Sequence, residues 1–298
     1  IVTLTGEDRI ADGTVAPYLD ESEPYEVGAV YGLADLNPIE EIRFSAGTRV
    51  DYWSTFGLAV SPRAALVLVP APTDIVKLMA GRAFRAPSIY ELVYNIPSAQ
   101  VRPDFDGTVL VPEAVWSAEL EYSHAFGPVW TGLLALHGSE ATNLIETVQA
   151  PGLEEGVVTY RNSDLRIRIG GADVELRRAF QGGLMFSAFY SALDSRYEDG
   201  SLVPNAPRHS AAFKVVVPIA RPTVRLALRS ALEGPRRIDI TREDTTGLAV
   251  VMDAVVSGTV PDLGFDYAAG VYNLLDADYS QPVTDTFPFR TMPQAGRT

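Results

Sequence analysis

The stretch EIRFSAGTRVDYW, residues 41–53, alternates apolar and polar side chains along its whole length. The side chains at even positions are mostly apolar: Ile42, Phe44, Ala46, Thr48, Val50 and Tyr52. Those at odd positions are charged, polar or small: Arg43, Ser45, Gly47, Arg49 and Asp51. Successive side chains of a β-strand point to opposite sides, so this period of two predicts a strand with one apolar and one polar face.

The same alternation recurs throughout the chain, and segments with the period of a helix are nearly absent. Three further examples are SDLRIRI (163–169), TVRLALRSAL (223–232) and LGFDYAAGVYN (263–273). In the first of these, Arg166 and Arg168 are expected on the polar face, opposite Ile167 and Ile169. The fold class predicted is therefore all-β, an antiparallel meander.

Strand length and loop rhythm decide between a soluble sandwich and a membrane barrel. Twelve candidate strands cover 24–36, 40–53, 58–70, 74–86, 111–126, 128–148, 158–180, 184–197, 205–218, 223–240, 247–260 and 263–280. Many exceed the five or six residues of an ordinary strand and reach the ~9 to 11 that cross a bilayer. Short turns alternate with longer joins, of which 87–110 is the longest. Alternating short turns and long loops are typical of a transmembrane β-barrel and favour it over the sandwich.

Composition excludes several classes of protein. The 298 residues are 47% hydrophobic, enough for a folded core, and the net charge of -14 makes binding to a phosphate backbone unfavourable, so nucleic acid is not expected as a partner. The absence of cysteine removes disulfides, thiolate metal sites and cysteine nucleophiles. Nowhere does the sequence hold the ~20 consecutive apolar residues of a spanning helix.

No residue pattern predicts catalysis, a metal site or a cofactor. The chain has three histidines, and none has a second histidine or a carboxylate at ligand spacing on one face. Glu119 and Glu121 share a face, as a glycosidase pair would, but two neighbours on the polar face of a strand explain them more simply. Ser210 follows His209 directly, and a strand places such neighbours on opposite faces. We expect no enzyme, no catalytic residue and no metal or other cofactor.

The stretch GRAFRAPSIYEL, residues 81–92, combines two arginines with the end of a strand. Arg82 and Arg85 lie three positions apart, so they are expected on opposite faces. An arginine facing lipid costs about 2 to 4 kcal/mol at mid-bilayer and about 0 to 1 near the interface, which places at least one of the two at the rim. Pro87 then ends the strand. Stabilisation of the rim is favoured over direct contact with a ligand, which remains the alternative.

The same stretch resembles a segment of TonB-dependent outer-membrane receptors, in which such a strand opens a large extracellular loop. Other stretches resemble the family in the family's order: GTRVDYW (47–53), SPRAALVLVP (61–70), LVPEAVWSAELEY (110–122), NAPRHSAAF (205–213), VYNLLDADY (271–279) and MPQAGRT (292–298). The resemblance covers residue 47 to the end of the chain. About 22 strands are typical of plugged transporters, and about twelve are recognisable here, so residues 1–298 are expected to form part of such a barrel. The plug domain and the last strand of the family are expected to be absent from these residues.

The resemblance implies a function, a location and partners. A receptor of this family in the cell outer membrane would take up a scarce extracellular solute, such as a ferric siderophore, a corrinoid or a glycan. The implied partners are the TonB energy-transducing complex, reached through the plug, a small-molecule or metal-chelate ligand, and outer-membrane lipid and lipopolysaccharide. The alternatives are a passive porin, an outer-membrane barrel enzyme and a soluble β-rich binding module.

Candidate ligand-binding residues lie in the long loop and on the strands beside the channel. The aromatic candidates in the 87–110 segment are Tyr90, Tyr94 and Phe105, whose rings could also fold back on the loop. The basic candidates are Arg82, Arg85, Arg166 and Arg168, the last two expected to face the lumen. Pairing of lumenal arginines with plug-domain or lumenal carboxylates is the favoured alternative.

Overall fold

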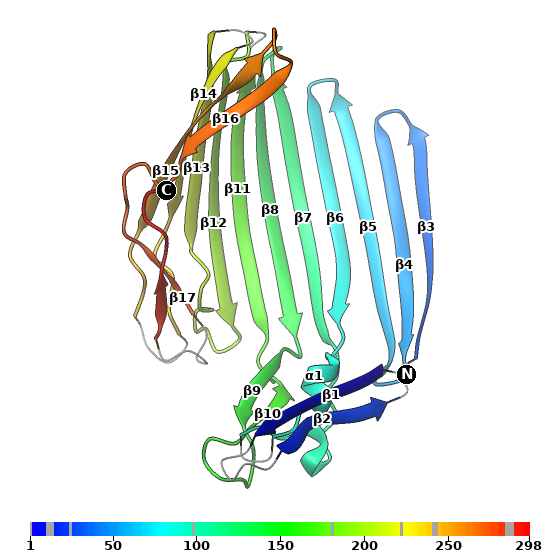
Figure 1. Cartoon of the computed structure of the whole chain (residues 1–298). Coiled ribbons are helices and arrows are strands. Elements are labelled where there is room, and N and C mark those ends of the chain that lie inside the picture. The colour runs from blue at the N-terminus through cyan, green and yellow to red at the C-terminus, as the bar shows by residue number, and fades with distance from the viewer. Residues whose placement is uncertain are drawn as a thin grey trace.

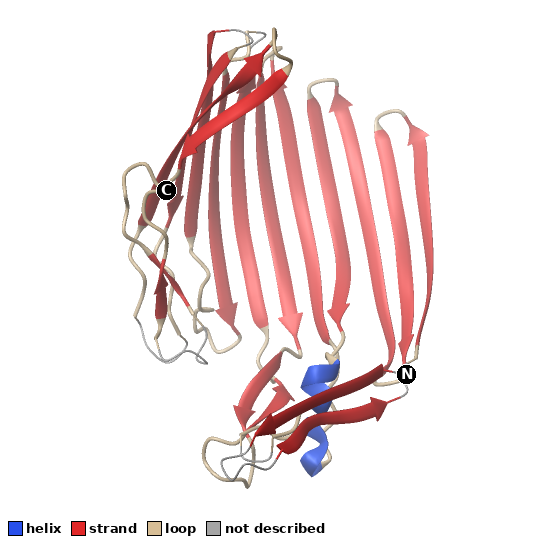
Figure 2. Cartoon of the chain, in the orientation of Figure 1, coloured by secondary structure: helices blue, strands red, loops and turns tan. Residues whose placement is uncertain are grey.

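The structure is a computed structural model of the chain. It describes residues 2–9, 15–23, 26–96, 99–179, 182–220, 223–239, 244–283 and 289–298, the first two ranges as backbone only. Figure 1 shows one curved layer of long strands, with smaller elements gathered at one end of that layer. Almost all the regular structure is β, and the helical segments are confined to that end (Figure 2).

The long strands form one antiparallel sheet of twelve, in the order β16-β15-β14-β13-β12-β11-β8-β7-β6-β5-β4-β3. Their bounds are Val27–Ile39 (β3), Ile42–Trp53 (β4), Gly57–Ala71 (β5), Asp74–Arg85 (β6), Glu113–Phe126 (β7), Trp130–Thr142 (β8), Ile167–Ala179 (β11), Met185–Tyr197 (β12), His209–Ala220 (β13), Val224–Glu233 (β14), Ala249–Val260 (β15) and Phe265–Val271 (β16). The predicted all-β antiparallel meander is confirmed, and every predicted strand corresponds to one strand of this sheet.

The remaining elements belong to the connections. They are the pairs β1 (Val2–Arg9) with β2 (Val15–Glu23), β9 (Ile145–Gln149) with β10 (Val158–Asn162) and β17 (Ser280–Pro282) with β18 (Thr291–Pro293), the helix α1 (Ile89–Val93) and the 3-10 helix η1 (Pro103–Asp106). The sequence predicted single strands over 128–148 and 158–180. Each divides instead into a sheet strand and one strand of the β9-β10 hairpin, because the chain leaves the sheet after Thr142 and rejoins it at Ile167.

The two ends of the sheet have different connections. At the short end, residues 40–41, 72–73 and 127–129 form tight turns, and Gly127 adopts a φ of +73° that favours glycine. At the opposite end, the loop end, strands β6 and β7 are joined by residues 86–112 and strands β8 and β11 by residues 143–166. The predicted alternation of short turns and long loops therefore holds for most of the described strands. The exception is the connection between β4 and β5 at the loop end, where residues 54–56 form a short turn.

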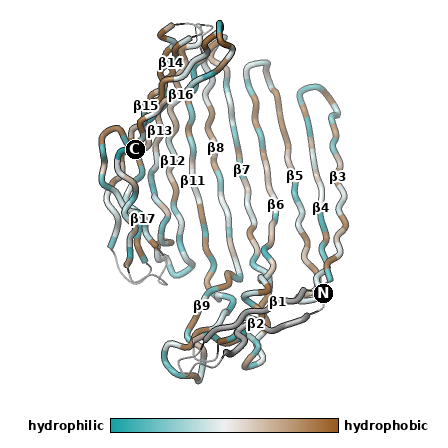
Figure 3. Tube along the Cα trace, viewed as in Figure 1, coloured by the Kyte–Doolittle hydropathy of each residue, from teal (hydrophilic) through white to brown (hydrophobic). Residues whose placement is uncertain are grey.

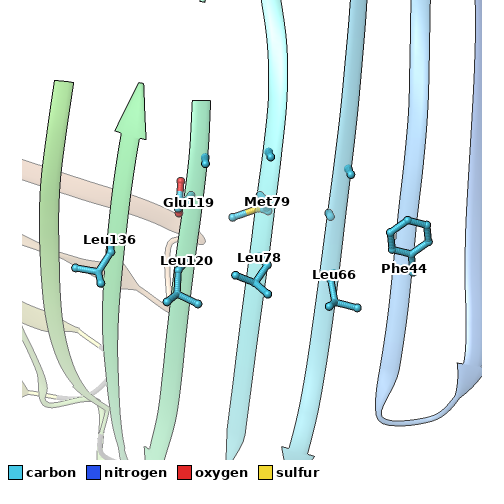
Figure 4. A pocket seen from close by; sticks show the side chains of 11 residues that line it. Phe44, Leu66, Leu78, Met79, Glu119, Leu120 and Leu136 are labelled. Atoms are coloured by element: carbon cyan, nitrogen blue, oxygen red, sulfur yellow. The ribbon is translucent and has the colours of Figure 1, made fainter. Parts of the chain in front are cut away.

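The ladder sorts side chains onto two faces, as the hydropathy along the strands also indicates (Figure 3). One continuous row of directly paired residues crosses six strands on the apolar face: Phe44, Leu66, Leu78, Leu120, Leu136 and Ala172. Figure 4 shows the first five of these side chains along a shallow pocket of about 480 Å³. Phe44 is 39% exposed and Leu136 46% exposed, so none of the described residues forms a second layer over this row.

The opposite face is polar. A pocket of about 510 Å³ on this face is lined by Ser45, Arg63, Ser117, Glu119, His137 and Ser139, among others. A sheet with one exposed apolar face and one polar face fits a wall between lipid and water. In the described residues, no helix has the length and apolar character needed to span a membrane.

Candidate functional site

The two long loops at the loop end of the sheet fold together into one body, here called the loop cap (residues 86–112 and 143–166). Its helix α1 begins at a capping box: Ser88 Oγ accepts a hydrogen bond from the Glu91 amide at 3.2 Å, and the Glu91 carboxylate accepts one from the Ser88 amide at 2.7 Å. Pro87, immediately before Ser88, is buried and ends the preceding strand. The cap therefore begins at the residues that the sequence motif supplies.

Arg85 ties the cap to the sheet. Its guanidinium donates to both carboxylate oxygens of Glu113, from Nε at 2.6 Å and from Nη2 at 2.7 Å, and it donates to Glu91 from Nη1 at 2.9 Å. Glu113 also accepts from the amide of Ile145 at 2.8 Å. One arginine thus joins β6, α1, β7 and β9. This arrangement supports the rim-stabilising role favoured from the sequence, and whether Arg85 contacts a ligand stays a proposal.

Arg161 of β10 joins the two loops of the cap. It donates from Nη2 to Asp106 at 2.5 Å and from Nη1 to the carbonyl of Pro103 at 2.8 Å. Its guanidinium also lies over the ring of Phe105, 5.5 Å from the centroid, a cation–π distance. Phe105 therefore folds back on the loop, as one of the two sequence-based alternatives proposed.

Three tyrosines from both loops form an aromatic cluster. Tyr90 stacks on Tyr94 with centroids 4.3 Å apart, and Tyr160 of β10 meets Tyr90 edge-on at 6.4 Å. Tyr90 remains 46% exposed. Stacked aromatic rings with an exposed face offer large apolar contact area at low entropy cost, which suits binding of a flat or aromatic ligand.

Backbone pairing and buried apolar residues complete the cap. Gln100 forms an isolated parallel bridge with Val158, and Val101 donates its amide to the carbonyl of Val158 at 2.8 Å. Val101, Ala150 and Val157 form a small buried cluster. The loops therefore share a core of their own.

The carboxylates of the cap are held ionised by their partners. The hydrogen bond from Arg161, helped by Thr108, holds the pKa of Asp106 below its ordinary value of 3.8. Partial burial raises the pKa of Glu91, but hydrogen bonds from Arg85 and Ser88 outweigh it and leave this pKa below 4.5. Both acids are therefore anionic at neutral pH and stabilise the cap in that state.

Arg82 lies on the apolar face, opposite to Arg85, as the spacing of three predicted. It pairs directly with Trp116 of β7, and its Nη1 donates to the carbonyl of Val60 on β5 at 2.5 Å. Pairing between β5 and β6 ends at Arg63 and Gly81, next to Pro62, which lacks an amide donor. The side chain of Arg82 thus supplies a bond to β5 where the ladder has stopped.

Arg166 and Arg168 do not face the polar side, so the predicted lumenal position is wrong for both. Arg168 pairs with Glu140 in the same continuous register that places Val174 and Leu176 on the apolar face. Arg166 reaches the same carboxylate, with Nη1 3.5 Å from Glu140 Oε1. At the rim of a membrane barrel, an outward-facing arginine can reach lipid headgroups and water. Polar side chains near a strand end therefore need not face the lumen.

The polar face carries ion pairs between neighbouring strands. Lys77 Nζ donates to Glu121 at 2.6 Å, and His137 Nε2 lies 3.5 Å from Asp173. Gly171 lies under the His137 ring, where an added Cβ would come within 2.5 Å of it. Among the described residues, no group of three or more histidines and carboxylates could hold a metal ion.

Several residues of this site were not predicted. The capping role of Glu91 in α1 could have been predicted from the sequence, because this glutamate follows Ser88 at the spacing of a capping box. Asp106 and Arg161 are 55 positions apart and Tyr160 lies in the other loop, so no local pattern brings them to the cap.

A family model described as TonB dependent receptor-like, beta-barrel, matches residues 4–274. The amphipathic meander and the loop cap are thus those of a TonB-dependent receptor barrel, and the chain belongs to this family. Members of the family are outer-membrane transport receptors.

Solved structures agree on the fold. The chain is similar to the ferric enterobactin receptor PfeA of Pseudomonas aeruginosa (mutant R480A, with enterobactin) at a TM-score of 0.74 and 16% identity, covering 92% of this chain and 44% of that one. It is also similar to the iron transporter FrpB of Neisseria meningitidis (TM-score 0.71, 14% identity, 92% and 44% covered). The siderophore receptor PirA of Acinetobacter baumannii gives a TM-score of 0.70 at 15% identity, with 85% and 42% covered.

At these low sequence identities, the similarity to the solved structures shows a shared fold only. The chain spans less than half of the length of each of these structures. No curated protein matches it.

Proposed function

We propose that this chain is the barrel portion of an outer-membrane receptor that takes up a scarce extracellular solute by TonB-coupled active transport. The solute belongs to the ferric siderophore, corrinoid or glycan class. The observation that carries the proposal is the loop cap at one end of an amphipathic twelve-stranded sheet, in a chain of the TonB-dependent receptor family. In this arrangement the sheet forms the lipid-facing wall, and the cap faces the medium.

The cap supports solute binding through its aromatic cluster. Tyr90 of α1 stacks on Tyr94, which directly follows the helix, and Tyr90 is 46% exposed. Planar chelates, corrin rings and sugar rings all pack on such a face. Phe105 is engaged by Arg161 and has a supporting role in binding.

The polar face supports transport rather than catalysis. Its carboxylates and basic groups, such as Lys77 with Glu121, line a wettable path and pair with one another. They are also suitable contacts for the acids and bases of a plug domain, through which the TonB complex would act. The proposed receptor carries out no chemical transformation.

The test uses the full-length receptor that contains this chain, in a strain from which its gene has been deleted. Uptake of radiolabelled catecholate and hydroxamate ferric siderophores, cobalamin and oligosaccharides is measured with and without the receptor. We expect saturable uptake of one class, abolished by a protonophore and by deletion of the TonB protein.

Two results would contradict the proposal. Uptake that rises linearly with solute concentration and ignores the protonophore would show a passive porin. A receptor that stays monodisperse in detergent-free buffer would show a soluble protein, because the exposed apolar face could not then meet lipid.

A further inference from the structure

A row of four charged residues and one tryptophan crosses the apolar face at the loop end of the sheet. Direct pairing links its members across five strands, β6, β7, β8, β11 and β12, in the order Arg82, Trp116, Glu140, Arg168 and Arg196. The next row towards the short end has small side chains on β6, β7, β8 and β11 and ends in Asp194 on β12. The row after that is apolar and ends in Ala192. The row therefore marks the edge of the apolar band.

The width of that band fits a bilayer. On β6 the next charged residue of this face is Asp74, eight positions from Arg82, which is about 26 Å along the strand. At Asp74 the carboxylate accepts from Tyr122 at 2.6 Å and lies 2.7 Å from His124 Nδ1, so polar groups border the band there too. Outward apolar bands of membrane barrels are about 25 Å tall, and strand tilt shortens the 26 Å to roughly 20 Å.

Two further arginines join the row. Arg166 contacts Glu140, and Arg208 Nη2 lies 3.1 Å from Asp194 Oδ1 on the same face. The group formed by these residues, the rim arginine cluster, comprises Arg166, Arg168, Arg196 and Arg208 with the carboxylates Glu140 and Asp194. The formal charges of these four guanidinium groups and two carboxylates sum to +2, on a chain whose net charge is -14.

The cluster is not explained by its own ion pairs. Arg168 and Arg196 stand directly opposite each other on neighbouring strands, and like charges in that position destabilise a sheet. The side chains of Arg166, Arg168 and Arg208 are each more than half exposed, so a ligand can reach their guanidinium groups. An anion bound between the strands would relieve this repulsion.

We propose that the rim arginine cluster binds the phosphate groups of an anionic glycolipid of the outer leaflet, of the lipid A type. Guanidinium groups bind phosphate oxygens in a bidentate manner. The proposal rests on the proposed function, because it requires the apolar face to lie in an outer membrane, and it assigns the lipopolysaccharide partner to particular residues.

A lipid fits the cluster better than a free phosphate. The cluster lies directly beside the apolar rows, so one molecule can place its phosphates on the arginines and its acyl chains along Leu136 and Val174. Trp116, 54% exposed in the same row, has the amphipathic ring that prefers headgroup depth. Free phosphate would use the arginines alone.

The experiment measures binding of the purified full-length receptor to detergent micelles that contain either bisphosphorylated lipid A or dephosphorylated lipid A, with a chelator present throughout. We expect the wild-type receptor to bind the phosphorylated form at least tenfold more tightly. The variant R166Q/R168Q/R196Q/R208Q should lose this preference. Arg177→Gln is the matched control, because Arg177 makes an ion pair with Glu175 of the same strand on the opposite face, and it should keep the preference.

Equal binding of both lipids by the wild-type receptor would overturn the proposal without relying on any variant, as would millimolar inorganic phosphate displacing the lipid completely. If the fourfold variant does not fold, the single variants R168Q and R196Q should each weaken the preference severalfold, and an unchanged preference in both would also overturn it. A receptor that forms a heat-modifiable membrane barrel but ignores lipid phosphate disproves only the cluster's role. A receptor that does not enter membranes at all disproves the proposed function.

Discussion

The guanidinium of Arg85 donates two hydrogen bonds to the carboxylate of Glu113, at 2.6 and 2.7 Å, and its Nη1 donates one to Glu91. This geometry makes the arginine of the strand-ending motif a fastening point for the loop cap. Because the side chain is 46% exposed, solvent screens part of the interaction.

We expect Arg85→Ala to loosen the loop cap rather than the sheet. Removing the bidentate pair should lower the free energy of local opening of residues 86–112 by roughly 1 to 2 kcal/mol. Hydrogen exchange measured by mass spectrometry should show about tenfold faster exchange there and no change in β11 and β12. A double-mutant cycle with Glu113→Gln gives the coupling, and additive effects of the two changes would contradict the direct pair.

The cap should also loosen in acid. The folded-state pKa values of Asp106 and Glu91 lie below their ordinary values of 3.8 and 4.5, so the unfolded cap binds more protons in that range. The stabilisation is complete above about pH 5 and is lost as the pH falls through the lowered values. Exchange rates corrected for intrinsic pH dependence should rise in residues 86–112 and 143–166 below pH 4. Asp106→Asn should be looser at neutral pH and show a flatter profile, and an unchanged profile would contradict the role of Asp106.

A disulfide should join the two loops of the cap. The chain has no cysteine, so Gln100→Cys with Val158→Cys introduces one unique pair at bridged positions. Paired positions of neighbouring strands lie within disulfide range. Oxidation should shift gel mobility reversibly, and the single-cysteine variants serve as controls. Failure of the pair to cross-link while both cysteines react with a thiol reagent would mean that the loops lie apart.

Tyr90 and Phe105 should differ in their effect on solute binding. Tyr90→Ala removes an exposed stacking ring and should weaken solute affinity by up to about tenfold, about 0.5 to 1.5 kcal/mol, and should change cap exchange less than Phe105→Ala does. Phe105→Ala removes the ring beneath Arg161 and should chiefly speed exchange of the cap. Binding titrations with the solute identified by uptake, together with exchange data, separate the two roles. The reverse pattern would contradict the assignment.

A charged substitution in the middle of the apolar face should destabilise the receptor in a membrane. Leu120 lies in the central row of the apolar face, and Leu120→Arg should cost about 2 to 4 kcal/mol in a membrane. Ser117→Arg, on the polar face of the same strand, is the control and should cost little. Heat-modifiable mobility of the outer-membrane fraction measures the assembled receptor. Equal losses in both variants would argue against lipid contact.

The sequence by itself determined the two faces of the long strands and the family. The period of two is local, because the direction of each side chain depends only on its own backbone, so Phe44 and Leu226 could be assigned to the apolar face directly. Family stretches in order along the chain then indicated a TonB-dependent receptor, which the family match confirms.

The tertiary structure decided what happens at the ends of the strands. Whether Arg168 faces lipid or lumen depends on the register of β11 against β8 and β12, and the rim allows charge on either face, so hydropathy alone gave the wrong face. The meeting of Asp106 with Arg161 depends on two loops closing together, which no local pattern records. Side-chain direction follows from neighbouring backbone, whereas register and loop contacts follow from pairing over long separations.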